Sequence, residues 1–215
     1  ENNIHCATRA DVARRAGVSV TVVSYVLNNN RYVDKEKRER VLRAVKELHY
    51  TPNNIARALK GKNSQHIIFI VDNTTNERFG RLMGEMDKVA YQKGSVVSLC
   101  ANRNDSEFVR QIIARRFDGI IISSISIPDE YIRNFVDAGI PVTLLLSKEY
   151  PQPEGVAKID TGLYQGAREC VRYLYAQGRR HIVYMDRVSS HDQFSDMTDN
   201  RYRGFVHEME ACGLS

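Results

Sequence analysis

Residues 8–28, TRADVARRAGVSVTVVSYVLN, decide the fold of the N-terminal part of the chain, because they predict two short helices around a tight turn. Thr8 can cap the first helix, and the acidic residue three positions later gives the spacing of a capping box. Gly17 stands where that helix must end, since glycine adopts a left-handed backbone at no steric cost. Ser19 can cap a second helix over 20–27. The pattern predicts a helix-turn-helix, although a simple pair of antiparallel helices would also fit it.

The next segment predicts a third helix over residues 35–49, with Asp34 as its cap. One side of this helix carries an apolar stripe, which we expect to close a small core over the first two helices. The stripe consists of Val41, Leu42, Val45 and Leu48. The charged opposite face is typical of solvated surface. Residues 1–51 are therefore predicted to form an all-α headpiece.

The charge of the chain is unevenly distributed. The 215 residues carry a net charge of +5, but residues 1–62 hold 13 Lys and Arg against 6 Asp and Glu, whereas residues 63–215 hold 18 against 20. A basic module joined to a nearly neutral body indicates a polyanionic partner for the basic module alone. With 42% hydrophobic residues, the chain can bury a substantial core and form more than one domain.

Residues 51–62, TPNNIARALKGK, predict a short helix that begins after Pro52 and ends at Gly61. Isolated helices shorter than about 12 residues are marginal in water. We therefore expect residues 52–62 to be a hinge that becomes helical against DNA or a partner subunit. A simple interdomain linker is the alternative.

From Gln65 onward, short apolar runs alternate with helical stretches, which is typical of a parallel sheet covered by helices on both faces. Strands are predicted at 66–71, 95–101, 118–123, 141–146, 156–159 and 180–185, and helices at 76–93, 105–116, 128–138, 162–177 and 198–211. We expect a first lobe over 63–150 and a second lobe that begins at 151. A ligand cleft is expected at the carboxyl ends of the strands.

Several classes of function lack support in the sequence. The cysteines (Cys6, Cys100, Cys170 and Cys212) form no metal-binding cluster, so we expect reduced thiols in a cytoplasmic protein and no metal. No apolar run approaches the roughly 18 residues of a membrane span, and no signal peptide is visible, so we expect no membrane partner. No glycine-rich phosphate loop follows a strand and no catalytic constellation converges at the strand ends, so we expect neither an enzyme nor a cofactor.

Taken together, the motifs resemble the LacI/GalR (lactose and purine repressor) family of bacterial transcription regulators over the whole chain. The resemblance is carried by TRADVARRAGVS (8–19), VSYVLN (23–28), YTPNNIARALKGKNS (50–64), DGIII (118–122), GIPV (139–142) and NRYRGF (200–205). It implies a helix-turn-helix headpiece with a hinge helix, followed by an α/β effector domain like that of periplasmic binding proteins, a doubly wound parallel sheet. Because the second lobe is longer in the family, we expect a C-terminally truncated chain.

The resemblance also implies a function. We expect a homodimer that binds a palindromic operator in double-stranded DNA, most simply as a repressor, under the control of a small-molecule effector such as a sugar or related metabolite. A soluble sugar-binding or sensor protein without a DNA-binding role is the alternative, and the basic headpiece argues against it.

In the family, the second helix reads the major groove and the hinge enters the minor groove. The resemblance implies that the base-facing residues are Val20, Thr21 and Tyr25. The residues nearer phosphates would be Thr8, Ser19, Ser24 and Asn28, together with Asn53 and Asn54 in the hinge. Ala56 and Leu59 would lie in the minor groove, where Leu59 would unstack and kink the central base pairs; Leu59 could instead pack on the α/β body. Core positions remain open for Val22, Val23 and Val26.

For the effector, the resemblance implies a cleft lined by Asn73, Phe79, Ser123, Asp160 and Arg201. The fork of Arg201 could bind a carboxylate or sugar hydroxyls bidentately, and a surface salt bridge is its alternative. Leu146 stands where many members carry an aspartate that binds sugar hydroxyls, which argues against a simple sugar.

Overall fold

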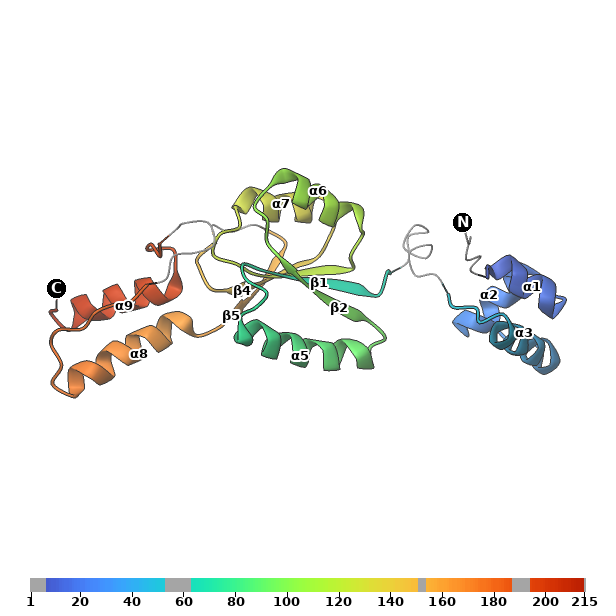
Figure 1. Ribbon diagram of the computed structural model, residues 1–215, viewed down its shortest axis with the longest axis horizontal. Coiled ribbons are helices and arrows are strands. Elements are labelled where there is room, and N and C mark those ends of the chain that lie inside the picture. Colours follow the sequence, from blue (N-terminus) through green and yellow to red (C-terminus); the bar gives the residue numbers. More distant parts are fainter. Residues whose placement is uncertain (1–6, 53–62, 151–153, 187–193, 215) are drawn as a thin grey trace. The chain divides into compact units, whose positions relative to one another are not determined.

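The computed structural model describes residues 7–52, 63–150, 154–186 and 194–214 (Figure 1). The chain divides into two units, Glu1–Ala56 and Arg57–Ser215. The first is a helical headpiece and the second an α/β body. The hinge expected over 52–62 lies almost wholly outside the described residues.

Three helices form the headpiece: α1 (Arg9–Ala16), α2 (Val20–Asn28) and α3 (Lys35–Glu47). The predicted caps are confirmed. Thr8 Oγ1 accepts a hydrogen bond from the Asp11 amide at 3.3 Å while the Asp11 carboxylate accepts one from the Thr8 amide at 2.9 Å, a complete capping box. Gly17 ends α1 with φ of 63°, and Ser19 caps α2. The buried core consists of Val12, Ala13, Ala16, Val23, Val26, Val41, Ala44 and Tyr50.

Two details of α3 differ from the sequence prediction. The helix ends at Glu47, two residues early, because His49 adopts a left-handed backbone with φ of 46° and the turn brings Tyr50 into the core. Leu42 was predicted to be a core residue, but it is 48% exposed. It lies one residue, or about 100°, around the helix from the buried Val41, and Ala44 occupies the core position instead.

A parallel five-stranded sheet forms the centre of the body, in the order β2-β1-β3-β4-β5. The strands are β1 (His66–Val71), β2 (Val96–Ala101), β3 (Gly119–Ser123), β4 (Val142–Leu146) and β5 (Val156–Asp160). Helix α5 (Glu77–Gln92) covers one face, while α6 (Ser106–Ala114) and α7 (Asp129–Asp137) cover the other (Figure 1). The prediction of a parallel sheet covered on both faces is therefore confirmed.

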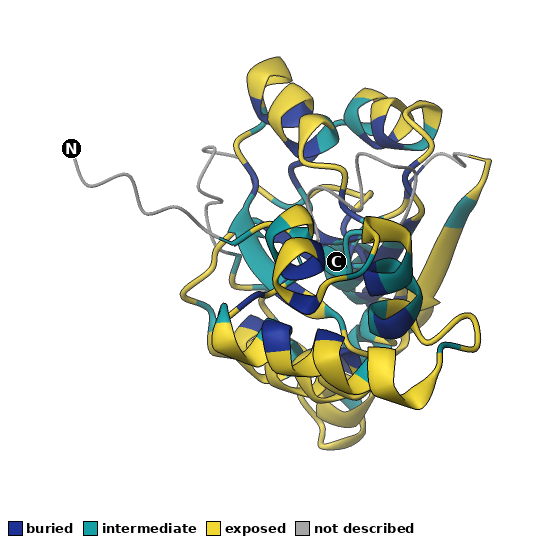
Figure 2. Cartoon of the chain, turned by 90° about the vertical axis from the view of Figure 1, so that its right-hand side faces the viewer, coloured by how far each residue is buried: buried dark blue, intermediate teal, exposed yellow. Residues whose placement is uncertain are grey.

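The alternation of side chains along β1 connects the sheet to two apolar cores. Ile68 and Ile70 pack with residues of α6 and α7, whereas Phe69 and Val71 pack with residues of α5. The helices are correspondingly amphipathic: in Figure 2 each carries buried stripes beside exposed ones.

Two predictions about the last part of the chain need correction. The strand over 156–159, which was expected to begin the second lobe, pairs with β4 and completes the first sheet as β5. The strand predicted over 180–185 does not form. Among the described residues, this segment pairs with no strand, and an apolar sequence alone does not make a strand.

Helices α8 (Leu163–Ala176) and α9 (Asn200–Ala211) follow the sheet and pack side by side (Figure 1). The start of α9 is tied to the end of β4, because the Asn200 amide donates to the Ser147 carbonyl at 3.1 Å and Lys148 pairs with Asp199 in an isolated bridge. The NRYRGF segment thus begins at the carboxyl edge of the sheet. No described helix is both long and apolar enough to cross a membrane.

Candidate nucleic-acid surface and effector cleft

Helix α2 presents one face to the headpiece core and another to solvent. Val23 and Val26 are 0% and 3% exposed and belong to the core, while Val22 is half-buried. The outward face carries five residues that we call the α2 ridge. They are Val20, Thr21, Ser24, Tyr25 and Asn28. Val20, Thr21 and Asn28 are exposed, and Ser24 and Tyr25 are half-buried. The residues predicted to face bases are thus available at the surface.

Thr8 and Ser19 are exposed at the starts of α1 and α2. Both hydroxyls act as helix caps, and the Thr8 hydroxyl also donates to the Asp11 carboxylate at 2.6 Å. Each helix N-terminus carries partial positive charge from its unpaired amides, which favours an anion nearby. The predicted hinge contacts, Asn53, Asn54, Ala56 and Leu59, lie outside the described residues.

Two arginines that the sequence reasoning missed flank the α2 ridge. Arg9 Nη1 donates to Ser24 Oγ at 3.3 Å, and the Arg31 guanidinium lies 5.2 Å from the centroid of the Tyr25 ring. The sequence does indicate that such arginines are needed, because α2 itself, VTVVSYVLN, has no charged side chain. A helix that contacts a polyanion without charges of its own must obtain cations from neighbouring segments.

In the body, polar side chains that follow the strands meet at the carboxyl edge of the sheet. Asp72, directly after β1, accepts hydrogen bonds from the Ile125 amide and the Ser126 hydroxyl, both at 2.7 Å, and from the Ser124 hydroxyl. Asn102, directly after β2, donates to Ser126 Oγ at 3.1 Å. This strand-end network holds the loop after β3 against β1 and β2. In the sequence, the polar residues directly after the apolar strands are the signal from which this network could be predicted.

The network extends to the segment after β4. The Tyr150 hydroxyl donates to the Ser124 carbonyl, and Lys148 Nζ donates to the Ile127 carbonyl at 3.0 Å and lies 4.8 Å from the Tyr150 ring centroid. Burial lowers the pKa of Lys148, an effect that the carboxylates of Asp129 and Asp72 oppose. Burial likewise raises the pKa of Tyr150, so its hydroxyl remains a donor at neutral pH. The hydroxyls and amides of this network are buried and hydrogen-bonded to one another, beside one partly desolvated amine.

The structure places the predicted effector residues at different depths. Asn73 and Asp160 are exposed and stabilise local turns, since Asn73 Oδ1 accepts from the Thr75 amide at 2.9 Å and Asp160 Oδ1 accepts from the Gly162 amide at 2.8 Å. Ser123 is 4% exposed at the end of β3. β4 lies between β3 and β5, so Ser123 and Asp160 are not neighbours.

Phe79, which is predicted to line the cleft, is largely buried. Phe79 is 9% exposed and meets Phe69 edge-on, with ring centroids 5.9 Å apart and planes at 84°. Phe69 itself is fully buried in β1. The Phe79 ring therefore packs in the core between α5 and the sheet, and contact of this ring with an effector stays a prediction.

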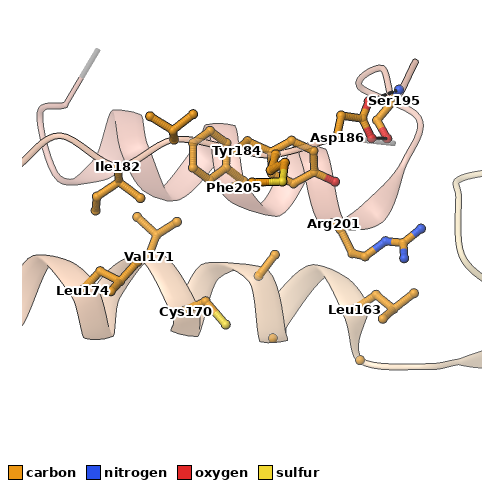
Figure 3. Close-up of a pocket in the computed structure, with 15 residues that line it drawn as sticks. Leu163, Cys170, Val171, Leu174, Ile182, Tyr184, Asp186, Ser195, Arg201 and Phe205 are labelled. Atoms are coloured by element: carbon orange, nitrogen blue, oxygen red, sulfur yellow. Dashed lines mark hydrogen bonds between the residues drawn. The ribbon is translucent and has the colours of Figure 1, made fainter. Parts of the chain in front are cut away.

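Arg201, in the first turn of α9, forms an ion pair with Asp199. Its Nη2 lies 3.1 Å from Asp199 Oδ2, and the Asp199 side chain is only 4% exposed. Arg201 also lines an open groove of about 750 Å³ between α8, residues 182–186 and α9 (Figure 3). The groove is largely apolar, with Val171 and Phe205 in its wall. Arg201 thus forms a salt bridge, which was the alternative to effector binding. Its contact with an effector stays a prediction.

The cysteines and potential metal ligands give no further site among the described residues. Cys100, Cys170 and Cys212 are free thiols. Burial raises the pKa of Cys100, against the opposing effect of Arg103 and Arg115, and so disfavours its thiolate form. No group of His, Cys, Asp and Glu in the described ranges is arranged to hold a metal ion.

Comparison with known proteins gives matches to both units. Residues 8–53 match the family profile described as bacterial regulatory proteins, lacI family, and residues 64–215 match that of periplasmic binding proteins and sugar binding domain of LacI family. The sucrose operon repressor of Pediococcus pentosaceus is 32% identical over 177 residues, which are 80% of this chain and 52% of that protein. The HTH-type transcriptional repressor PurR of Pectobacterium carotovorum is 28% identical over 214 residues, 97% of this chain and 61% of that protein.

Solved structures agree with these matches. The Lac repressor dimer bound to operator and the anti-inducer ONPF superposes with a TM-score of 0.76 at 25% identity, over 98% of this chain and 64% of that one. A LacI family regulator from Silicibacter pomeroyi gives a TM-score of 0.71 at 26% identity, over 97% and 62%. The chain spans between half and two thirds of the length of these relatives. With a helix-turn-helix headpiece and a parallel-sheet body that each match, the chain belongs to the LacI family of bacterial regulatory proteins.

Proposed function

We propose that this chain carries the DNA-reading headpiece and the first effector-binding lobe of a transcription repressor. The repressor would bind a palindromic operator as a homodimer in the cytoplasm, under the control of a small-molecule effector. The observation that carries the proposal is the α2 ridge. This face of α2 points outward from a basic headpiece, while Val23 and Val26 on the opposite face of the helix are buried. The relatives named above are repressors, which favours regulation over catalysis.

The chemistry of the α2 ridge suits the major groove. Val20 and the Tyr25 ring are apolar surfaces that can contact thymine methyl groups, while the Thr21 hydroxyl can donate to or accept from base edges. Ser24 and Asn28 lie on the same face and can reach phosphates. Thr8 and Ser19 would contact phosphates next to the amides that they cap.

The hinge would complete the interface. In this proposal Asn53 and Asn54 contact phosphates, and Ala56 and Leu59 enter the minor groove, where Leu59 separates two base pairs at the dyad. Unstacking a base step costs a few kcal/mol and is offset by the larger contact surface of the bent duplex. Because two hinges would meet at one dyad, binding would depend on the dimer.

The effector would bind at the carboxyl edge of the sheet, with Asn73, Ser123, Asp160 and Arg201 near it. The strand-end network would fix this edge, and the exposed side chains of Asn73 and Asp160 could hydrogen-bond a polyhydroxylated ligand such as a sugar or a related metabolite. Leu146, at the end of β4, offers no carboxylate to such a ligand, so we expect a different set of contacts from a simple sugar site.

Binding to DNA is the direct test. The 215-residue chain should select a palindromic duplex from a random library and shift it in a gel, and its affinity should fall steeply between 50 and 200 mM salt because Lys and Arg contacts release counterions. A dimer of the chain that binds no duplex, or binds it without dependence on salt, would contradict the proposal. It would favour the alternative of a sugar-binding sensor.

A matched pair of substitutions locates the interface. Val20 is 46% exposed on α2 and Leu42 is 48% exposed on α3, so both can be shortened without opening a core cavity. Val20→Ala should weaken specific binding about fivefold, since a lost contact to a base is worth about 1 kcal/mol. Leu42→Ala should leave it unchanged. Equal effects of the two would remove α2 as the reading helix.

A further inference from the structure

The α2 ridge has no charged group, yet guanine is read most strongly by an arginine fork that donates to O6 and N7 together. Thr21 and Ser24 carry single hydroxyls, and Val20 is apolar. If the ridge acted alone, it would distinguish thymine methyl groups well and guanine poorly. A guanidinium from another element would supply the missing contact.

Arg9 is placed for this role although it belongs to α1. It is the first residue of that helix, and its Nη1 reaches across to Ser24 Oγ, in the middle of the α2 ridge. Ser24 donates its own proton to the Val20 carbonyl at 3.0 Å, so towards Arg9 its hydroxyl acts as an acceptor. The guanidinium therefore lies on the ridge itself rather than at its margin.

The other two arginines of α1 are held differently. Arg14 Nη1 lies 3.2 Å from Asp11 Oδ1, and Arg15 Nη2 lies 2.6 Å from Glu47 Oε2. Within the described part of the chain, Arg9 has no such carboxylate. Its Nε is buried without a hydrogen-bond partner, and its one hydrogen bond is 3.3 Å long, beyond the usual range for N–H···O bonds.

This arrangement makes the Arg9 fork available to a ligand. The half-buried stem between α1 and α2 restricts the side chain to few rotamers, so little entropy is lost when the fork is fixed. A single long hydrogen bond to a hydroxyl is easily exchanged for two shorter bonds to one base edge. In the free protein the buried Nε of Arg9 makes no hydrogen bond. A small outward movement of the Arg9 side chain on binding is therefore further favoured.

We propose that Arg9 is a base-reading residue, which leaves Ser24 and donates bidentately to O6 and N7 of one guanine in each operator half-site. The inference rests on the proposed function and extends it: the operator would hold a G·C pair at a fixed distance from the bases that Val20 and Thr21 contact. A phosphate contact is the other use of an arginine at this place. The position over the middle of the α2 ridge favours the base.

The test is selection from duplexes randomised across the half-site, with the 215-residue chain, Arg9→Lys and Arg9→Leu. Arg14→Leu serves as the control, because it removes the same charge from the same helix. The wild-type chain should select guanine at one fixed position. Arg9→Leu should lose that preference by tenfold or more while the other positions stay unchanged, and Arg9→Lys should keep only part of it, since a lysine lacks the planar fork of the guanidinium. Arg14→Leu should keep the preference.

Each other outcome is decisive. If the wild-type chain binds selectively and Arg9→Leu keeps the guanine preference, the inference is wrong while the proposed function stands. A uniform loss of affinity in Arg9→Leu, with a salt slope smaller by about one and full rescue by lysine, would make Arg9 a phosphate contact and also overturn it. A wild-type chain that selects no sequence would overturn both proposals. Circular dichroism of the variants confirms that they are folded.

Discussion

The carboxylate of Asp118 binds Ser64 twice, through the Ser64 amide at 2.6 Å and the Ser64 hydroxyl at 2.8 Å. It also accepts from the Gln65 amide at 2.8 Å. Ser64 and Gln65 precede β1, and Asp118 precedes β3 in the neighbouring position of the sheet. The first described residues of the body are thus fixed to the sheet by a side chain more than fifty positions away in the sequence.

Removal of this carboxylate should destabilise the body. Asp118→Ala leaves two backbone amides and one hydroxyl without their acceptor, and we expect the unfolding free energy to fall by about 2–3 kcal/mol, since a hydrogen bond to a charged group contributes about 1.5–3 kcal/mol. Hydrogen exchange at residues 64 and 65 should accelerate. Asp137→Ala, which removes an exposed carboxylate from α7, is the control. Unchanged exchange at 64 and 65 would show that Asp118 does not hold this segment.

The helix pair of the second unit depends on one glycine. A Cβ added to Gly204 on α9 would lie 2.3 Å from the Tyr164 carbonyl oxygen of α8, a distance that backbone atoms cannot accommodate without a shift. We expect Gly204→Ala to lower the melting temperature, with a cost of about 1–3 kcal/mol, as is typical of overpacking. Calorimetry of the purified variant provides the measurement.

Gly166 on α8 is the matched control. A Cβ there meets nothing within 4 Å, so Gly166→Ala should be neutral or stabilising by about 0.5–1 kcal/mol through the higher helix propensity of alanine. If both substitutions had the same effect, close approach of α8 and α9 at Gly204 would not explain the result.

The same helix pair predicts a pH dependence. Glu208 is 4% exposed and accepts hydrogen bonds from Arg168 Nε at 2.7 Å and Arg172 Nε at 3.0 Å. These hydrogen bonds lower the pKa of Glu208. Because the folded-state pKa is below the unfolded value of about 4.3, the interaction stabilises the fold above that pH, and this contribution is lost as the pH falls through the lowered pKa.

Glu208→Gln isolates that contribution, because the amide keeps the shape and loses the charge. The melting temperature of the variant should be lower than that of the wild-type chain at pH 7, and the difference should shrink as the pH falls from 7 towards 3. In the variant Arg168 and Arg172, whose side chains are 31% and 53% exposed, lie beside a neutral group. A difference that is constant over this pH range would argue against a charged Glu208 in the folded protein.

Much of the fold follows from local sequence, and the departures have physical causes. Capping residues and apolar period place the helices of the headpiece within two residues, because these signals act within one turn. The failure at 180–185 is of another kind: the segment has the composition of a strand, but a strand exists only where a neighbour pairs with its backbone. Likewise, the sequence of β5 does not show which sheet the strand joins. Only its pairing with β4 places it in the first sheet.

In the candidate sites, too, some features follow from local sequence and others depend on contacts between distant residues. Helical period and capping suffice to place Val20 and Thr21 outward, since burial of Val23 and Val26 fixes the rotation of α2. The contact of Arg9 with Ser24 spans 15 residues and two helices, so no local pattern predicts it. The edge-on contact of Phe79 with the buried Phe69 also joins a helix to a strand, so local sequence does not predict it either.

Substitutions of Thr8 and Thr21 should affect the stability of the headpiece and the reading of DNA to different extents. Thr8 Oγ1 caps α1, so Thr8→Ala should destabilise the headpiece by about 1 kcal/mol, the usual loss of an N-cap. Thr21 is exposed on the α2 ridge, so Thr21→Ala should leave the melting temperature unchanged and weaken operator binding. Thermal melting and gel shift of both variants at 25 °C measure the two effects. Binding weakened by Thr8→Ala alone, with Thr21→Ala indistinguishable from the wild-type chain, would move the reading surface from α2 to the start of α1.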